Sequence, residues 1–285
     1  MDRFKATKRA GILGIFCNII LLFIKSIIGY TARSQAMIAD SINSASDIFA
    51  SLMTFVGNKI ASEPKDDNHN FGHGKAEYIF SLFISISMVI VSLKLCYDSI
   101  LSLINGSELE FSYFLVVVCI ITIIIKFALY IYTKNLYEKH NNILLKANCE
   151  DHRNDCIVTS FTLVSIIASL YGFGFLDGLV GTGISVWIFY TGATIFLESY
   201  NVLMDISVDE DTKNLILDLA NSYKDILKIG HLYSSPIGEK YIIVLSIYVD
   251  GNLPTFESHN LADSLEKSIK ALDNVSNAIV HVNPM

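Results

Sequence analysis

Six apolar segments, each about long enough to cross a bilayer, constrain the fold of this 285-residue chain more than any other feature. A helix needs about 20 apolar residues to span the hydrocarbon core, where the backbone can hydrogen-bond only to itself. Hydrophobic residues make up 52% of the chain and charged residues 17%, against about 25% charged in soluble domains. We therefore predict an all-α membrane bundle of six transmembrane helices, at residues 10–30, 36–60, 79–104, 112–133, 147–171 and 177–200.

The composition changes after Tyr200, where apolar runs shorten and charged and turn residues recur every few positions. Period-3.6 and period-2 patterns alternate there in the order α-β-β-α-β, which favours a small cytoplasmic α+β domain with a ferredoxin-like, metallochaperone-like sheet. The expected elements are 209–223, 226–234, 241–249, 256–272 and 275–282, and the strand ending at 234 is followed by a Ser-Pro-Ile-Gly turn. The predicted domains are residues 1–205, including the loop 61–77, and residues 206–285.

Charge sets the topology and excludes some partners. Lysine and arginine concentrate before the first helix and in the even-numbered loops, so the positive-inside rule places both termini in the cytoplasm of a cell (inner) membrane protein. The net charge is −7, and residues 206–285 carry 6 Lys or Arg against 11 Asp or Glu. This excess of acid argues against nucleic acid as a partner. The five cysteines lack the paired spacing of a thiolate zinc site, so we interpret them as packing residues.

Costly polar side chains interrupt the second and fifth segments. Asn43 and Asp47 are four residues apart, as are Asp151 and Asp155, so each pair shares one helix face. Charged groups inside a bilayer cost on the order of 3 kcal/mol each and are usually functional. We predict a divalent-cation site of three carboxylates and one amide oxygen where the two helices meet. The competing interpretation is polar contact between helices, or helix ends lying in interfacial water.

The loop after the second segment holds His69 and His73, four residues apart and accompanied by aspartates. Imidazole and carboxylate groups both bind zinc or manganese. Loops are naturally rich in such residues, so this pattern is weaker than the one in the helices.

With these motifs in view, the chain resembles the cation diffusion facilitator family over essentially its whole length. The strings that carry the resemblance are ADSINSASD at 39–47, DNHNFGHGKAE at 67–77 and DHRND at 151–155. The resemblance implies a homodimer that exports a divalent metal from the cytoplasm in exchange for protons, by alternating access and without a cofactor. It places the transport site on Asn43, Asp47, Asp151 and Asp155, a loop site on Asp66, His69 and His73, and a charge interlock on Lys75 and Asp205.

Departures from the family pattern bear on the metal. Zinc exporters of the family usually have a histidine where this chain has Asn43 or Asp151. An all-oxygen set suits a harder ion, so the expected cargo is Mn²⁺, with Fe²⁺ possible because it neighbours Mn²⁺ in the affinity order. The alternatives are a Zn²⁺ or broad-range exporter of the same family, and a membrane metal sensor without flux. An intramembrane metallohydrolase is disfavoured because no His-Glu-x-x-His motif occurs, so no enzyme activity is predicted.

The cytoplasmic domain also departs from the zinc-type pattern. The resemblance places a binuclear site there, and Ser246 and Asn283 stand where a histidine and a carboxylate are expected. A full binuclear site is therefore not predicted. His231, His259 and His281 could still hold one ion between protomers, or could be ordinary surface histidines of a dimerisation domain.

Overall fold

The computed structural model describes residues 3–31, 35–105, 113–169, 171, 175–238 and 240–285. The chain forms two compact units, which we describe separately. The first comprises Met1–Glu63 and Ala76–Tyr200, and the second comprises Pro64–Lys75 and Asn201–Met285. The loop Pro64–Lys75 thus groups with the C-terminal unit.

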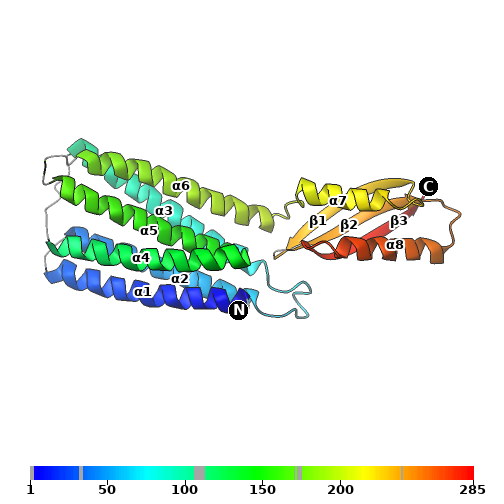
Figure 1. Cartoon of the computed structure of the whole chain (residues 1–285), viewed down its shortest axis with the longest axis horizontal. Helices are drawn as coiled ribbons and strands as arrows, with labels where there is room; N and C mark the ends of the chain where they lie inside the picture. The colour runs from blue at the N-terminus through cyan, green and yellow to red at the C-terminus, as the bar shows by residue number, and fades with distance from the viewer. Residues whose placement is uncertain (1–2, 32–34, 106–112, 170, 172–174, 239) are drawn as a thin grey trace. The chain divides into compact units, whose positions relative to one another are not determined.

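The first unit is a bundle of long helices, with α1 beside α2 and α4 beside α5 (Figure 1). The six expected segments are confirmed as helices: α1 Arg3–Thr31, α2 Gln35–Ala61, α3 Ala76–Asn105, α4 Tyr113–His140, α5 Ile143–Ser169 and α6 Phe175–Leu203. Within the described residues, α1, α3 and α4 are each long and apolar enough to cross a membrane unaided. The other three carry the polar residues that interrupt the apolar pattern or include positions outside the described part.

Many polar side chains lie inside this bundle beside buried apolar ones, and many large apolar side chains lie on its outside. Phe16, Phe23 and Ile124 are each more than 60% exposed, which suits a surface that faces lipid. Among the buried polar contacts, the Asn18 amide donates to the Ser51 hydroxyl at 3.3 Å. Asn148 likewise donates to Thr54 at 2.9 Å. Such small and polar contacts hold helices together in lipid, where burial of apolar surface supplies no driving force between them.

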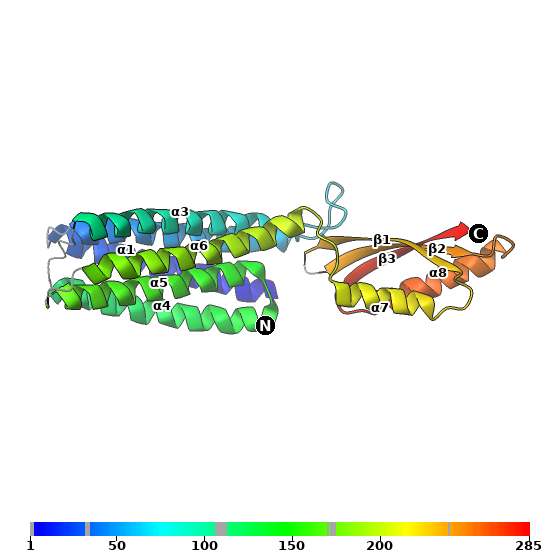
Figure 2. The ribbon, with the colours of Figure 1, turned by 90° about the horizontal axis from the view of Figure 1, so that it is seen from above.

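The second unit is a three-stranded sheet with two helices on one face (Figure 2). Its elements are α7 Glu210–Asn221, β1 Lys228–Ile237, β2 Lys240–Val249, α8 Thr255–Lys270 and β3 Val275–Pro284. The strand order is β1-β2-β3, with β1 antiparallel and β3 parallel to β2. Alternate residues of β2, namely Ile243, Leu245 and Ile247, are fully buried against the helices. The predicted α-β-β-α-β order is confirmed.

The first strand is longer than the sequence suggested. We expected it to end at Ser234, before a Ser-Pro-Ile-Gly turn, but β1 continues to Ile237 with Pro236 opposite Tyr241. Proline is tolerated there because β1 is an edge strand and needs no donor on its outer side. Gly238, directly after the strand, takes a left-handed conformation, with φ of +63°.

Candidate metal transport site

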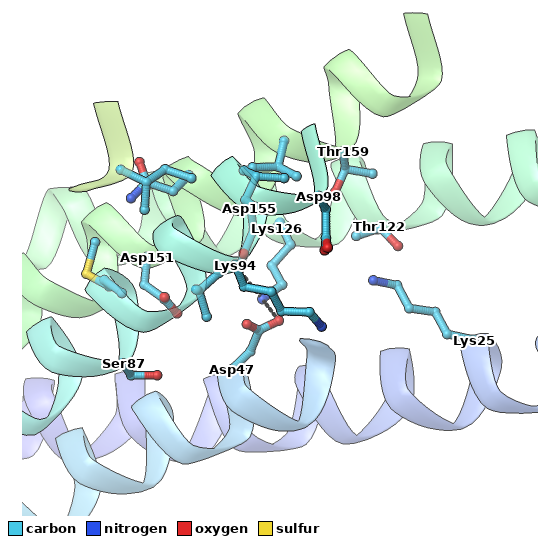
Figure 3. Close-up of a pocket in the computed structure, with 16 residues that line it drawn as sticks. Lys25, Asp47, Ser87, Lys94, Asp98, Thr122, Lys126, Asp151, Asp155 and Thr159 are labelled. Atoms are coloured by element: carbon cyan, nitrogen blue, oxygen red, sulfur yellow. Dashed lines mark hydrogen bonds and ion pairs between the residues drawn. The ribbon is translucent and has the colours of Figure 1, made fainter. Parts of the chain in front are cut away.

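The predicted transport residues come from two helices, α2 and α5. The Asn142 side chain accepts hydrogen bonds from the backbone N–H groups of Leu144 and Leu145 at 2.8 and 3.2 Å, which fixes the start of α5. Asp151 and Asp155 follow two and three turns later on one face of α5. Asp47 lies on α2 and is 6% exposed. The three carboxylates line one cavity (Figure 3).

A lysine from a third helix joins this cluster. The Lys126 ammonium, on α4, lies 2.6 Å from Oδ2 of Asp47 and 2.5 Å from Oδ2 of Asp155. Its side chain is 1% exposed, so the ion pairs form out of contact with water. Lys25, Lys94 and Asp98 line the same cavity, so four carboxylates share it with three ammonium groups, and an excess of one negative charge remains that a cation can neutralise.

Asp151, His152 and Asp155 form a group with metal-ligand geometry. One potential ligand atom from each residue lies within 4.8 Å of the others. Oδ2 of Asp151 and both ring nitrogens of His152 are buried and find no hydrogen-bond partner among the described residues. Buried polar atoms without partners are costly, and a bound cation would satisfy them. The group could offer two oxygens and one nitrogen to a metal.

The fourth predicted ligand is Asn43. The backbone of Asn43 belongs to α2, one turn before Asp47, so the two positions share a helix face. The side chain of Asn43 lies outside the described residues.

Sequence reasoning missed both Lys126 and His152. Lys126 is the sole charged residue between positions 112 and 133, and a lone intramembrane charge is itself a signal of a functional site. Its helix is apolar on every side, however, so the sequence does not tell which face is turned inward. The sequence motif that contains His152 indicates no separate role for this residue as a metal ligand.

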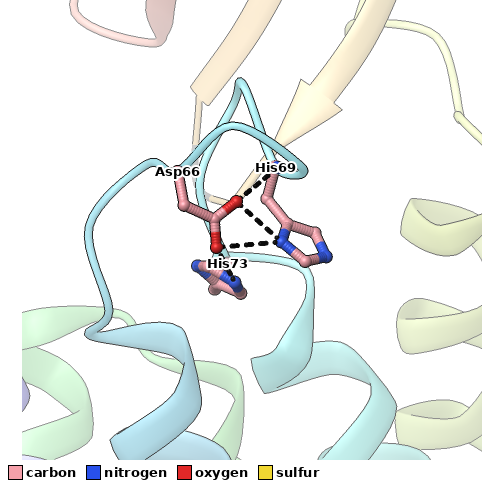
Figure 4. A group of neighbouring side chains, drawn as sticks. All are labelled: Asp66, His69 and His73. Atoms are coloured by element: carbon pink, nitrogen blue, oxygen red, sulfur yellow. Dashed lines mark hydrogen bonds and ion pairs between the residues drawn. The ribbon is translucent and has the colours of Figure 1, made fainter.

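Asp66, His69 and His73 lie together in the loop between α2 and α3. Nδ1 of His69 lies 3.0 Å from Oδ1 of Asp66, and Nε2 of His73 lies 3.6 Å from Oδ2 (Figure 4). The three residues bring potential ligand atoms within 4.8 Å of one another. Backbone N–H groups of His69 and Asn68 donate to Oδ1 of Asp66 at 2.6 and 3.0 Å. The His69 N–H bond is the main cause that lowers the pKa of Asp66, so a ligand carboxylate is held ionised.

Beside this loop, Lys75 and Asp205 form an ion pair at 2.8 Å. Asp205 has a φ of +57°, and the same carboxylate oxygen accepts a hydrogen bond from Ser235 at 2.7 Å. The pair therefore joins the end of the loop to the residues that follow α6 and to β1.

The three histidines of the C-terminal unit are exposed. On the open face of the sheet, His281 on β3 pairs in register with Ser246 on β2, and the backbone N–H of His231 on β1 donates to Ser246 Oγ at 2.6 Å. His259 lies on α8, where its ring is 3.6 Å from Asp263. Within the described part of one chain, these three histidines do not form a ligand group. A site shared between protomers stays a prediction.

Comparison with known proteins agrees with this architecture. Residues 11–204 match the family model of the cation efflux transmembrane domain, and residues 208–285 match that of the cation efflux protein cytoplasmic domain. The chain is 28% identical to the magnetosome protein MamB of Magnetospira sp. (strain QH-2), over 95% of this chain and 92% of the relative. It is 26% identical to the manganese efflux system protein MneP of Bacillus subtilis (strain 168), over 99% and 98%. It is 27% identical to the cation-efflux pump FieF of Shewanella oneidensis, over 93% and 90%.

Proposed function

This chain belongs to the cation efflux (cation diffusion facilitator) family of divalent-cation transporters, and we propose that it exports Mn²⁺ from the cytoplasm in exchange for protons. It is a membrane transporter rather than an enzyme, and its cytoplasmic domain indicates dimerisation. The observation that carries the proposal is the convergence of Asp47, Asp151 and Asp155 on one cavity, where Asp47 is buried and the other two are half-buried. Asn43 lies one turn before Asp47 on α2. We assign these four residues as the transport site.

The donor set supports Mn²⁺ as the cargo. Three carboxylates and an amide oxygen are hard ligands, which suit Mn²⁺ better than the softer Zn²⁺. The manganese efflux protein MneP aligns with nearly the whole chain, although the identity is low. A second candidate is Fe²⁺ or Zn²⁺, because the buried imidazole of His152 lies within ligand distance of Asp151 and Asp155 and could add a nitrogen donor.

Proton exchange follows from the same carboxylates. A metal ion and protons compete for the same oxygens, so protons arriving from the outer side can replace the metal as it leaves. Alternating access of the site then couples inward proton flow to outward metal flow.

The proposal has three further parts. The protein lies in the inner membrane with both termini in the cytoplasm, and a second ion binds at Asp66, His69 and His73. Lys75 and Asp205 form an interlock near the dimer interface.

The test is metal uptake into inside-out proteoliposomes under an imposed pH gradient. Mn²⁺, Fe²⁺ and Zn²⁺ are compared for the parent protein, Asp47→Ala and Asp155→Ala, with Glu138→Ala on the exposed end of α4 as the matched control. We expect Mn²⁺ to be taken up fastest, the two aspartate variants to lose transport and the control to keep it. Transport at the parental rate in both aspartate variants would refute the site.

A second experiment addresses the metal and the competing function. The double variant Asn43→His/Asp151→His introduces imidazole ligands, and we expect its preference to shift from Mn²⁺ toward Zn²⁺. Preferential Zn²⁺ transport by the parent would instead make ligand hardness the wrong criterion and favour the second candidate. Intact metal binding without flux of any ion would favour a membrane metal sensor.

A further inference from the structure

The position of Lys126 bears directly on how a metal ion can enter this site. One nitrogen bridges Asp47 and Asp155, which are two of the proposed ligands, at 2.6 and 2.5 Å. A divalent ion would have to be coordinated by these same carboxylate oxygens. The ammonium and the metal ion therefore cannot occupy this place together. We propose that Lys126 is a tethered competing cation, which a metal must displace toward Asp98 before it can bind.

The electrostatics favour competition over permanent neutralisation. Lys126 pairs with two of the three carboxylates, and Oδ2 of Asp151 has no hydrogen-bond partner among the described residues. Lys25, Lys94 and Asp98 also line the cavity, so four carboxylates share it with three ammonium groups and one negative charge stays unbalanced. A divalent ion at the same place supplies one more unit of charge than the lysine. At such short distances in a poorly hydrated site that difference is large, whereas a monovalent ion offers no advantage over the ammonium already present. The lysine would therefore favour divalent over monovalent cations.

The cavity also offers the displaced ammonium a destination. It has a volume of about 190 Å³ and is lined by Asp98 on α3, together with Thr122 on α4 and Thr159 on α5 (Figure 3). Thr122 lies one turn before Lys126 on the same helix. A lysine side chain has four flexible methylenes, so its ammonium can change partners while its backbone stays in place. Asp98 is the carboxylate of this cavity that does not belong to the proposed metal site.

The consequence is a weakened apparent affinity for the metal. When a site is open to ligand only a fraction of the time, the apparent dissociation constant rises by the inverse of that fraction. If Lys126 holds the carboxylates about nine-tenths of the time, the Kd rises about tenfold, and a transporter gains easier release on the far side. This inference rests on the proposed transport site, but it concerns a residue outside the ligand set.

The first experiment measures Mn²⁺ binding to the purified full-length protein in detergent by calorimetry. We expect Lys126→Gln and Lys126→Met to bind Mn²⁺ about tenfold more tightly than the parent, and Lys126→Arg to remain near it. Lys134→Gln removes the same charge from an exposed position of α4, and we expect its Kd to stay unchanged. A gain of affinity cannot arise from misfolding. Weaker or unchanged binding by both neutral variants, when they unfold at the parental temperature, would overturn the proposal.

The second experiment tests the destination of the ammonium. Asp98→Asn should weaken Mn²⁺ binding several-fold in the parent, because the displaced lysine loses its acceptor, and should have no effect in the Lys126→Gln background. Equal effects in both backgrounds would refute the role of Asp98. Unchanged Mn²⁺ binding by Asp98→Asn in the parent would also refute the role of Asp98, and this arm needs no lysine variant to fold.

Transport kinetics distinguish this inference from the proposed function. We expect Lys126→Gln to lower both KM and kcat for Mn²⁺, because binding tightens and release slows, whereas a merely structural lysine would lower kcat without lowering KM. Asp47→Ala and Asp155→Ala remove binding if the site is correct, whether or not Lys126 competes. If those variants still bind and transport, the site itself is wrong. If only the Lys126 variants fail to gain affinity, the competition alone is wrong.

Discussion

The ammonium of Lys75 lies 2.8 Å from Oδ1 of Asp205, although 130 residues separate them in sequence. Ser235 donates to the same oxygen at 2.7 Å, so one carboxylate ties the loop Pro64–Lys75 to the first strand of the sheet. The loop is close-packed there, because a Cβ added to Gly74 would come within 3.1 Å of the Gly238 Cα. The loop and the β1–β2 turn therefore depend on each other for their positions.

Asp205→Asn should loosen this contact while keeping an acceptor for Ser235. We expect faster amide hydrogen exchange at residues 64–75, with a loss of stability below about 1 kcal/mol because the pair is solvent-exposed. Lys213→Ala, which removes an exposed ion pair within α7, is the control and should leave the loop unchanged. Exchange at the parental rate in Asp205→Asn would show that the pair does not order the loop.

The same ion pair predicts a pH dependence. Hydrogen bonds from Lys75 and then Ser235 lower the pKa of Asp205 from its ordinary value of 3.8. A carboxyl group with a lowered pKa in the folded protein stabilises the fold above its unfolded pKa, and this stability is lost as the pH falls through the folded value. The exchange difference between parent and Asp205→Asn should therefore be full at pH 7, begin to fall near about pH 4 and disappear as the pH falls through the lowered pKa of Asp205. A difference that grew on acidification would contradict this assignment.

The proposed loop metal site depends on the turn that Asp66 organises. Asp66→Ala removes both the acceptor for the backbone N–H groups and a ligand, whereas Asp66→Asn keeps the acceptor and loses the charge. We expect Asp66→Ala to lose loop binding of Mn²⁺ altogether and Asp66→Asn to retain a weaker site. Since the pKa of Asp66 is lowered, its protonation should not limit binding between pH 5 and pH 7. Equilibrium dialysis in the Asp155→Ala background isolates this site, and equal binding by all three proteins would show that no metal is held here.

The sequence predicted those features that are local in the chain. The helices follow from long apolar runs, and β2 follows from the β-branched run between Tyr241 and Val249. The Asp66, His69 and His73 group was accessible because its members lie within eight residues. Lys126 could not be assigned to the site from the sequence. The face that α4 turns inward is decided by packing against α5 and α1 rather than by a local sequence pattern. At Pro236 the local pattern predicted a turn, and this prediction was wrong because the residue pairs with β2 in an edge strand instead.

Glu77 joins three helices at one end of the first unit. It is 1% exposed and accepts from Arg3 of α1 at 2.5 Å and from the α5 cap Asn142 at 3.0 Å. Glu77→Gln keeps the shape and loses the ion pair, so we expect about 2 kcal/mol of destabilisation, seen as a lower thermal midpoint in detergent. The double variant with Arg3→Gln should lose less than the sum of the single losses, because both changes remove one interaction. Additive losses would show that Arg3 and Glu77 contribute to stability independently of each other.

A pair of glycines on α6 tests how closely this helix approaches α3. A Cβ added to Gly178 would lie 2.7 Å from the backbone oxygen of Ser99 and 2.9 Å from the backbone nitrogen of Leu103, and neither atom can move without shifting α3. We expect Gly178→Ala to cost about 1–3 kcal/mol through overpacking. At Gly183, an added Cβ meets no described atom within 4 Å, so Gly183→Ala should be neutral or stabilise by up to about 1 kcal/mol through helix propensity. Thermal unfolding of the two variants side by side measures the difference, and equal midpoints would mean that α3 and α6 are not in close contact at Gly178.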